Sequence, residues 1–459
     1  MTTHRPFVQL AGLGLAVVLL GGFTPERAVT SKLRSTASAT LAPGDVAPGR
    51  LFARDAREGI GPGLVSVSNP TSPQPLAAPL APETRRSKST LLHVAPGSAA
   101  TQLVLPITAP EDAWVMVIPK GSDAKVGEDA LRDVSMFDPR GLRADVRAAR
   151  DASAQLGADA DRLKAEGISK PIAMLRLSRD MGQGLYKLQV GAKAAKVGLA
   201  IEIREPSSST ELAITPSTLQ FSPDTEGYVT VGLQSDVPLE RVRVEATLYT
   251  PGYERDRTVP VVKVGKEYRA MVSQVLTDRD APGTWMVEVH ATGTAGGQTF
   301  DRLEQTAFGF VVPTARIASV GSERQVRNSS GRVTSLEVDV VVESQGLDRY
   351  EVTGTLVATD GKGVERPVAE AQVTDQLGAG SHVLTLRFDA GHAGLSKLGG
   401  TYALRGLQLY SLGTNTLYHR LSRGLEVRFP AVRVDELAAP EMTPALETML
   451  REGAFNVRE

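Results

Sequence analysis

The sequence predicts an all-β fold built from tandem immunoglobulin-like antiparallel β-sandwiches, with one helical insertion in the first sandwich and a short C-terminal helix. Three observations support this prediction. A phrase of glycine, any residue and an aromatic residue recurs along the chain, each copy opens a run of alternating apolar and polar residues, and Gly- and Pro-rich turns separate the runs. The length of 459 residues suits about three such domains.

The three copies of the repeated phrase end at Tyr186, Trp285 and Tyr402. They recur at intervals of roughly 100 to 120 residues, close to the roughly 100 residues of one immunoglobulin-type sandwich, which has a structural aromatic near the start of its second-to-last strand. Val287 and Val289 follow Trp285 on the same face of the predicted strand. We therefore interpret the three aromatic residues as structural anchors in successive cores. The alternative for Trp285 is an exposed ring that stacks on a sugar.

An Arg-Leu pair precedes the closing strand in two copies, as Arg302-Leu303 and Arg420-Leu421. With the glycine-x-aromatic strand starts, this pattern resembles bacterial exported proteins with tandem immunoglobulin-like β-sandwich modules, whose function is mostly unknown. The resemblance covers residues 211–430 well and residues 89–205 loosely. It implies an array of β modules in the cell envelope, and it implies no active site.

Composition excludes several classes of function. The chain has no cysteine, which rules out disulfides, thiolate catalysis, cysteine-ligated zinc and iron–sulfur clusters. Lys and Arg number 51 against 52 Asp and Glu, for a net charge of −1. A balanced charge gives no long-range attraction to nucleic acid or to anionic lipid, so we expect no nucleic-acid partner. We also expect no cofactor.

The N-terminal part of the sequence predicts export. Residues 1–23 join a basic start to a short apolar run, which is typical of a signal peptide. An uncleaved anchor is the alternative and would be the chain's only membrane contact. Residues 24–88 are rich in Pro, Ala and Ser, and we predict a disordered spacer there. The expected location is periplasmic, cell-surface or secreted.

The remaining chain divides into three predicted β modules and a tail. The first module covers residues 89–205 and is interrupted near 139–166 by a predicted helix, with Asp138 as N-cap and Pro139 as first helical residue. That helix either packs across its own sandwich or docks a partner. The second module covers residues 206–313 with seven predicted strands, and the third covers 314–430. In the tail, 431–459, Thr443 and Pro444 predict a short helix.

Few residues suggest catalysis. Ser122 and Lys125 match Ser-x-x-Lys, a short motif that arises readily by chance, and it falls in a predicted loop. There is no Gly-x-Ser-x-Gly, no phosphate-binding loop and no His-Glu-x-x-His. We therefore assign no catalytic residue. An enzyme, or an enzyme subunit with its site around Ser122 and Lys125, is kept as an alternative.

Four aspartates are weak candidates for a calcium site. Asp278 and Asp280 precede Trp285, and Asp224 and Asp301 fall in other predicted loops of the second module. Loops at one end of a sandwich converge, so their carboxylates can meet around an ion. Asp also favours turns for its own backbone hydrogen bonds, which is the competing interpretation. We assign no metal.

The leading hypothesis is a non-catalytic binding or structural protein of the bacterial envelope. Its partner would be an envelope protein or a glycan, and strand addition at a sheet edge is the simplest mode of binding. A second alternative beside the enzyme is an inhibitor or chaperone of a secreted hydrolase, with the tail helix as the docking element.

Overall fold

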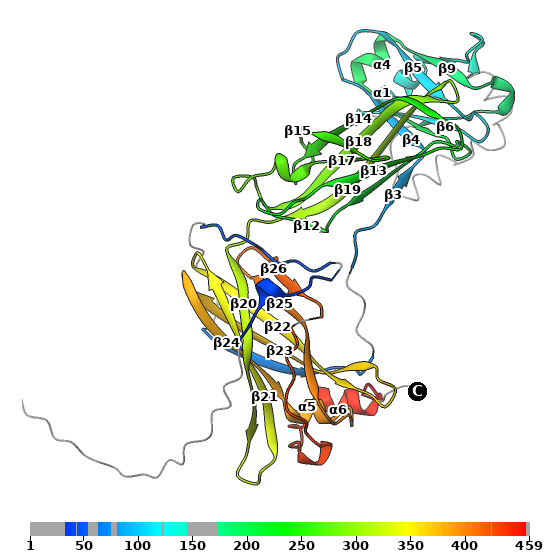
Figure 1. Ribbon diagram of the computed structural model, residues 1–459. Coiled ribbons are helices and arrows are strands. Elements are labelled where there is room, and N and C mark those ends of the chain that lie inside the picture. The colour runs from blue at the N-terminus through cyan, green and yellow to red at the C-terminus, as the bar shows by residue number, and fades with distance from the viewer. Residues whose placement is uncertain are drawn as a thin grey trace, which may run out of the picture.

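The computed structural model describes residues 33–42, 44–53, 63–74, 80–120, 124–144, 172–423 and 425–455. Its strands form six sheets, and the sheets face one another in pairs as three successive sandwiches (Figure 1). The predicted all-β sandwich architecture is confirmed. We call the sandwiches module 1 (89–205), module 2 (206–313) and module 3 (314–430). The predicted signal peptide lies outside the described residues.

Module 1 stacks the sheet β4-β10-β6-β8 on the sheet β5-β9-β7. Its strands are β4 (Ser89–Val94), β5 (Thr101–Ile107), β6 (Trp114–Pro119), β7 (Val134–Phe137), β8 (Ala173–Arg176), β9 (Gly184–Val190) and β10 (Leu199–Arg204). Two helices accompany them, α1 (Ala124–Leu131) and α4 (Ala192–Val197). All pairings in this module are antiparallel.

The predicted helix start at Asp138 and Pro139 is wrong. Asp138 is buried, and its carboxylate accepts hydrogen bonds from the backbone N–H of Arg140 (3.0 Å) and of Leu142 (2.9 Å). These bonds close a turn, and Arg143 then pairs back with Phe137. The aspartate therefore caps a turn instead of a helix. The rest of the predicted insertion, from residue 145 on, lies outside the described residues.

Module 2 stacks the sheet β16-β17-β13-β11-β3 on the sheet β12-β19-β18-β14-β15. Its strands are β11 (Glu211–Pro216), β12 (Gln220–Phe221), β13 (Val229–Gln234), β14 (Leu239–Tyr249), β15 (Arg255–Val259), β16 (Val261–Val264), β17 (Glu267–Ala270), β18 (Gly283–Ala295) and β19 (Gln298–Phe310). The short strand β12 runs parallel to β19. Trp285, Val287 and Val289 point into the core between the sheets.

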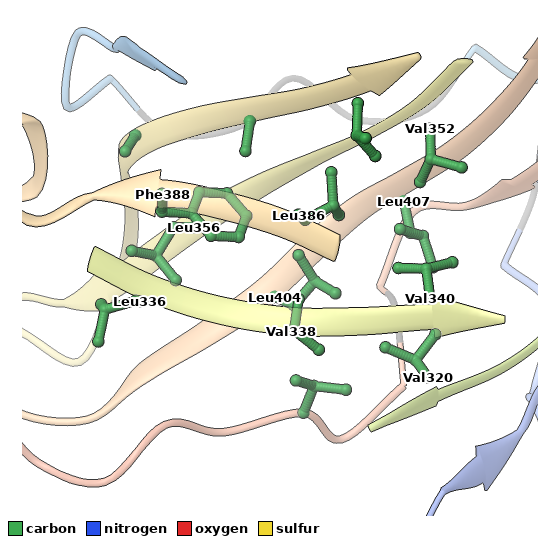
Figure 2. Packing of buried hydrophobic residues seen from close by; sticks show 14 of the residues in the cluster. Val320, Leu336, Val338, Val340, Val352, Leu356, Leu386, Phe388, Leu404 and Leu407 are labelled. Carbon is green, nitrogen blue, oxygen red and sulfur yellow. The ribbon is translucent and has the colours of Figure 1, made fainter. Parts of the chain in front are cut away.

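Module 3 stacks the sheet β1-β20-β21-β24 on the sheet β2-β23-β22-β25-β26. Its own strands are β20 (Ala315–Arg327), β21 (Val333–Ser344), β22 (Asp348–Thr359), β23 (Glu365–Leu377), β24 (Gly380–Asp389), β25 (Tyr402–Ser411) and β26 (Thr416–Leu421). Figure 2 shows apolar side chains of β21 and β24 meeting those of β22 and β25 between the sheets. A short helix, α5 (Ala390–Gly394), follows β24.

The predicted C-terminal helix is present as α6 (Pro444–Arg451). Thr443 caps it by accepting the backbone N–H of Leu446 at 3.2 Å, and Pro444 is its first residue. Leu446 and Phe455 are buried. The tail therefore packs on its own chain through Leu446 of the helix and Phe455 beyond its end.

Three described parts of the segment predicted as a disordered spacer are strands in the sheets. Its three strands are β1 (Arg34–Ser35), β2 (Val65–Pro70) and β3 (Arg85–Ser87). β1 pairs with β20, β2 with β23 and β3 with β11, all antiparallel. Phe52 also enters the core cluster of module 2. The prediction failed because these pairings use the backbone and need no apolar run in the sequence. We call residues 33–87 the N-terminal segment.

The N-terminal segment contacts both margins of the module 3 sandwich. On one side β1 extends β20, and Val46 bridges to Arg420 of β26. On the other side β2 extends β23, and the Ser68 hydroxyl accepts the backbone N–H of Asp389, the last residue of β24, at 3.0 Å. The segment therefore ties the two sheets of module 3 together at both margins.

Candidate functional site

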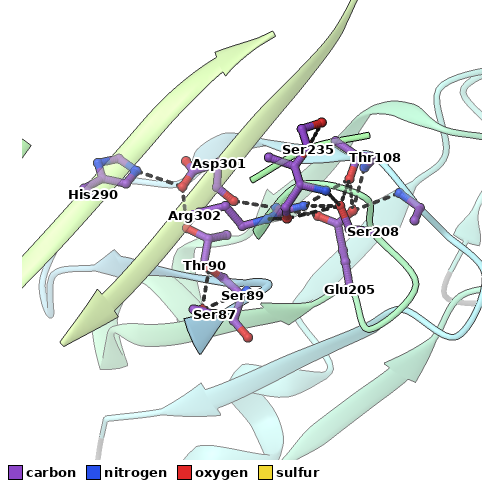
Figure 3. Close-up of polar contacts among 12 residues, drawn as sticks. Ser87, Ser89, Thr90, Thr108, Glu205, Ser208, Ser235, His290, Asp301 and Arg302 are labelled. Atoms are coloured by element: carbon purple, nitrogen blue, oxygen red, sulfur yellow. Dashed lines mark hydrogen bonds and ion pairs between the residues drawn. The ribbon is translucent and has the colours of Figure 1, made fainter. Parts of the chain in front are cut away.

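A buried arginine stands at the junction of modules 1 and 2. Arg302 lies on β19 and is fully buried. Its Nε donates to the carbonyl oxygen of Thr210 at 3.0 Å, and its two terminal nitrogens donate to the Glu205 carboxylate at 2.9 Å and to the Ser208 hydroxyl at 2.7 Å (Figure 3). Further bonds reach the Asp301 carbonyl oxygen (2.6 Å) and the Thr108 hydroxyl (3.1 Å). All five donors of the guanidinium are thus used.

The Glu205 carboxylate completes this network from the other side. Glu205 follows β10 and is as buried as its partner, with each side chain 1% exposed. Its second oxygen accepts the backbone N–H of Thr108 (2.7 Å), the Thr108 hydroxyl (2.6 Å) and the backbone N–H of Ala109 (2.9 Å). We call Arg302, Glu205, Thr108, Ser208 and Thr210 the junction network. It fastens a loop of module 1, the linker and a strand of module 2 to one another.

A buried ion pair of this kind fixes geometry more than it adds stability. Removing two charges from water costs several kcal/mol per ion, and the pair recovers this only when every donor and acceptor is satisfied. Arg302 and Glu205 meet that condition. The junction network therefore joins the two modules through directional bonds that are all satisfied.

A second polar group lies beside the junction network. One Asp301 oxygen bonds to the Thr90 hydroxyl of β4 (2.5 Å) and to Nε2 of His290 on β18 (2.8 Å). The hydrogen bond with Asp301 raises the pKa of His290, and burial opposes the shift. The three side chains do not form a nucleophilic triad, because the carboxylate stands between the hydroxyl and the imidazole. They form a further contact between modules 1 and 2.

The four calcium candidates do not share a site. Asp280 accepts a bond from Arg257 at 2.7 Å, and Asp224 accepts the Ser222 hydroxyl at 2.9 Å. Asp301 faces module 1, and Asp278 is exposed. Within the ranges that the structure describes, no three His, Asp or Glu side chains are grouped to hold a metal. The turn interpretation describes Asp280 and Asp224 better than the calcium interpretation.

The region of the Ser-x-x-Lys motif differs from the prediction. Lys125 lies in the first turn of α1 instead of a loop, and Ser122 lies outside the described residues. An open depression of about 490 Å³ lies on the same module, with Arg132, Asp133 and Ser135 in its lining. Asp133 accepts the backbone N–H of Lys193 at 2.7 Å and so fixes the start of α4. The hydroxyl of Ser135 accepts a hydrogen bond from Arg143 at 3.2 Å.

The three repeated aromatic residues are buried, and each makes the same hydrogen bond. The Tyr186 hydroxyl donates to the Gly182 carbonyl oxygen (2.7 Å), the Tyr402 hydroxyl to that of Leu398 (2.8 Å), and the Trp285 indole N–H to that of Ala281 (2.9 Å). Each acceptor precedes its donor by four residues. Burial raises the pKa of Tyr402 to about 12. Trp285 is only 2% exposed, so it offers no face to a sugar.

Sequence reasoning missed the junction network. It recorded Arg302 only as half of an Arg-Leu repeat. The available signal was the strand alternation, which places Arg302 on the same face as Phe300 and Phe308, both buried. A charged residue at an inward position of a strand predicts a buried partner. Glu205 and Ser208, in the linker, had no comparable signal.

Comparison with known proteins supports the fold. Residues 317–428 match the family model described as the C-terminal domain of a domain of unknown function, DUF4785. The crystal structure of a DUF4785 family protein from Legionella pneumophila superposes with a TM-score of 0.59 at 18% identity, covering 85% of this chain and 99% of that one. No curated protein sequence matches the chain.

Two further solved structures share less with this chain. A Salmonella alpha-2-macroglobulin reacted with methylamine aligns over 80% of this chain and 24% of that one, at 9% identity and a TM-score of 0.19. The chicken interferon gamma receptor alpha chain aligns over 47% of this chain and 97% of that one, at 10% identity and a TM-score of 0.23. None of the helices in the described part of the chain has the length and hydropathy needed to cross a bilayer.

Proposed function

We propose that this chain is an exported, non-catalytic binding or structural protein of the bacterial envelope that acts through its immunoglobulin-like modules. The observation that carries the proposal is the fixing of one module to the next. The junction network joins modules 1 and 2, and the N-terminal segment contributes strands to modules 2 and 3. A rigid row of β-sandwiches presents surfaces at set distances, which suits binding or spacing more than catalysis.

Modules 2 and 3 are also held in direct contact. The Gln220 side chain donates to the carbonyl oxygen of Leu417 at 2.9 Å. The backbone N–H of Phe52 donates to the carbonyl oxygen of Pro313 at 3.0 Å, at the boundary between the two modules. These contacts support a row whose parts keep their relative placement when a partner binds.

Export is the first part of the proposal to test. The full chain with a C-terminal affinity tag is expressed in a Gram-negative host and followed by osmotic-shock fractionation. We expect the tag in the periplasmic or membrane fraction, with a mass reduced by the signal peptide if it is cleaved. Replacing apolar Leu19 and Leu20 of the signal with aspartates is expected to retain the protein in the cytoplasm. A cytoplasmic location for the unaltered chain would contradict the proposal.

Binding is the second part. The tagged full chain is incubated with envelope extract from the same cells, with and without calcium, and with cytoplasmic extract as the control. A stoichiometric envelope protein, or retention on cell-wall glycan, is the expected result. Absence of both, with turnover of a hydrolase substrate panel, would replace the proposal with the enzyme alternative.

A further inference from the structure

In the described residues, the N-terminal segment adds a strand at the edge of three sheets and bridges to a fourth edge. β1 lies along Ser319 and Val320 of β20, β2 along β23 and β3 along β11, and Val46 bridges to Arg420 on β26. The rest of β20 is interrupted by register irregularities against β21. An uncovered edge exposes a row of N–H and C=O groups that can pair with another chain. The edges that remain uncovered are therefore the places where strand addition is possible.

Nearly all of the remaining edges are short or protected. β16 has Lys263 within its four residues, β15 has Arg255 and Arg257, and β5 contains Pro106. β7 and β8 have four residues each, and β4 lies against β19 of module 2 through the bond from Thr90 to Asp301. Lysine, proline and short length are the common devices that prevent edge-to-edge pairing.

β24 differs from all of these edges. It has ten residues with no proline, no lysine and a single arginine, Arg387, and it pairs with β21 without a bulge, from Asp389 opposite Ser335 to Gly380 opposite Ser344. It lies at the margin of module 3 (Figure 1). The backbone N–H of Asp389 donates to the Ser68 hydroxyl. The backbone N–H and C=O groups of Asp389 therefore face away from β21.

Strand alternation then places the backbone groups of Ser381, Val383, Thr385 and Arg387 on the same open edge as Asp389. Among the described residues, none of these four has a backbone partner at that edge. The described hydrogen bonds from the N-terminal segment reach β24 at Asp389. The backbone N–H and C=O groups of these four residues are therefore the open part of the β24 edge.

The side chains beside this edge define what strand would fit. Val383 is 63% exposed and lies opposite Val341 of β21, so it offers an apolar surface. The Arg387 side chain is 61% exposed, and its Nε lies 3.7 Å from Glu337, which also holds Arg324 at 2.9 Å. The terminal nitrogens of Arg387 are therefore available to a new carboxylate.

We propose that the β24 edge is an acceptor for an extended strand of a partner protein. The added strand runs antiparallel to β24, with an acidic residue opposite Arg387 and, four positions later, a β-branched apolar residue opposite Val383. This inference rests on the proposed binding function and names the kind of partner. Backbone pairing supplies the attachment, and the two side-chain pairs supply the selectivity.

A second copy of this chain fits the edge poorly. In a two-fold antiparallel pair centred on Thr385, each Arg387 would face Val383 of the other copy, so neither side chain would find the partner it needs. Centring the pair on Arg387 would place two guanidinium groups together. Centring it on Val383 would pair the valines but place each Arg387 opposite Ala379, without a carboxylate. A partner strand with a separate sequence can give Arg387 a carboxylate and Val383 an apolar neighbour at once.

The test uses the full chain and labelled synthetic peptides of about ten residues, with binding followed by fluorescence anisotropy. The first peptide has Glu and Val four positions apart in a Thr- and Ser-rich strand. The second replaces its Glu with Lys, and the third is the first with backbone N-methyl groups on the edge-facing residues. Amide hydrogen exchange of residues 380–389, measured by mass spectrometry, reports where the peptide binds.

We expect the first peptide to bind and to protect residues 380–389, and the N-methylated peptide to fail. The second peptide should bind up to about fivefold more weakly, the upper range for one cross-strand charge pair, and Arg387→Gln should remove that difference. Val383→Lys should weaken binding at least about tenfold. The matched control Val264→Lys, at an exposed valine of the β16 edge, should leave binding unchanged.

Three results would overturn the inference. They are equal binding of the N-methylated peptide, equal effects of Val383→Lys and Val264→Lys, and binding of no peptide at all. Concentration-dependent dimers that Val383→Lys disrupts would assign the edge to a second copy instead. An envelope partner captured equally well by Val383→Lys would leave the proposed function standing while removing β24 as its site.

Discussion

Replacing Arg302 by methionine tests the junction network directly. The change keeps most of the side-chain volume but leaves the Glu205 carboxylate, 1% exposed, without its cation. Breaking a buried ion pair from one side typically costs about 3–5 kcal/mol, because the remaining charge stays desolvated. Loss of the five guanidinium hydrogen bonds adds to the same effect, since Ser208 and Thr210 lose their donor as well.

The double variant Arg302→Met with Glu205→Gln isolates that charge penalty. The amide oxygen of a glutamine can still accept the N–H groups of Thr108 and Ala109. A neutral pair leaves no buried charge, so the double variant should recover at least about half of the loss. Arg243→Met is the matched control, because Arg243 lies on the same module with its side chain 76% exposed, and it should cost less than about 0.5 kcal/mol.

The two tryptophans provide the assay. Trp114 lies on β6 of module 1 and Trp285 on β18 of module 2, one on each side of the junction. Urea unfolding followed by tryptophan fluorescence should give one coupled transition for these modules in the parent chain and two separated transitions in Arg302→Met. A loss below about 1 kcal/mol, or a double variant no more stable than the single one, would refute this account of the junction.

Three further predictions concern other parts of the fold. Trp285→Phe keeps an aromatic ring in the core but removes the hydrogen bond to Ala281, so it should lower the free energy of unfolding by about 1 kcal/mol. Trp285→Ala should lower it by about 3–5 kcal/mol. Equal losses for the two variants in urea titrations would contradict the role of the indole N–H. Burial lowers the pKa of His419 to about 4 from 6.5, so its neutral form stabilises module 3 above pH 6.5 and that stability is lost as the pH falls to 4. The free energy of unfolding should fall by about 3 kcal/mol in the parent chain and should not fall in this way in His419→Gln, as measured by urea titrations followed by circular dichroism. The same dependence on pH in both proteins would refute the prediction. Phe52→Ala should destabilise module 2 by about 3 kcal/mol and speed proteolysis of the N-terminal segment, while the exposed-site control Val67→Ala should do neither.

The sequence predicted the parts of the fold that depend on local pattern. The glycine-x-aromatic phrases mark strand starts because the glycines at 184, 283 and 400 adopt positive φ and each following aromatic bonds back over its turn. The alternation after Trp285 places Val287 and Val289 in the core. Thr443 and Pro444 predicted α6 because capping is a short-range interaction.

Elements that depend on distant partners were not predictable in the same way. β2 has no fully buried residue and pairs with β23 about 300 positions later, so its short run of valine and serine gives no strand signal strong enough to distinguish it from a linker. β20 contains the polar run Ser322, Glu323 and Arg324, and its pairing with β21 has three register irregularities. These features interrupt the alternation of apolar and polar residues that would have marked it as a strand. Arg302 was visible but its partners in the linker were not.

The path of the N-terminal segment makes the modules depend on one another. The chain first pairs with module 3, then inserts Phe52 into module 2, returns to module 3 as β2, and lines module 2 as β3 before module 1 begins. A fragment that begins at Ser89 therefore lacks one strand from each of three sheets. It would expose the edges of β11, β20 and β23 and create new sites for strand addition that the whole protein does not have. Binding by such a fragment would report on those artificial edges, whereas binding by the full chain reports on β24 and the surfaces that the segment leaves open.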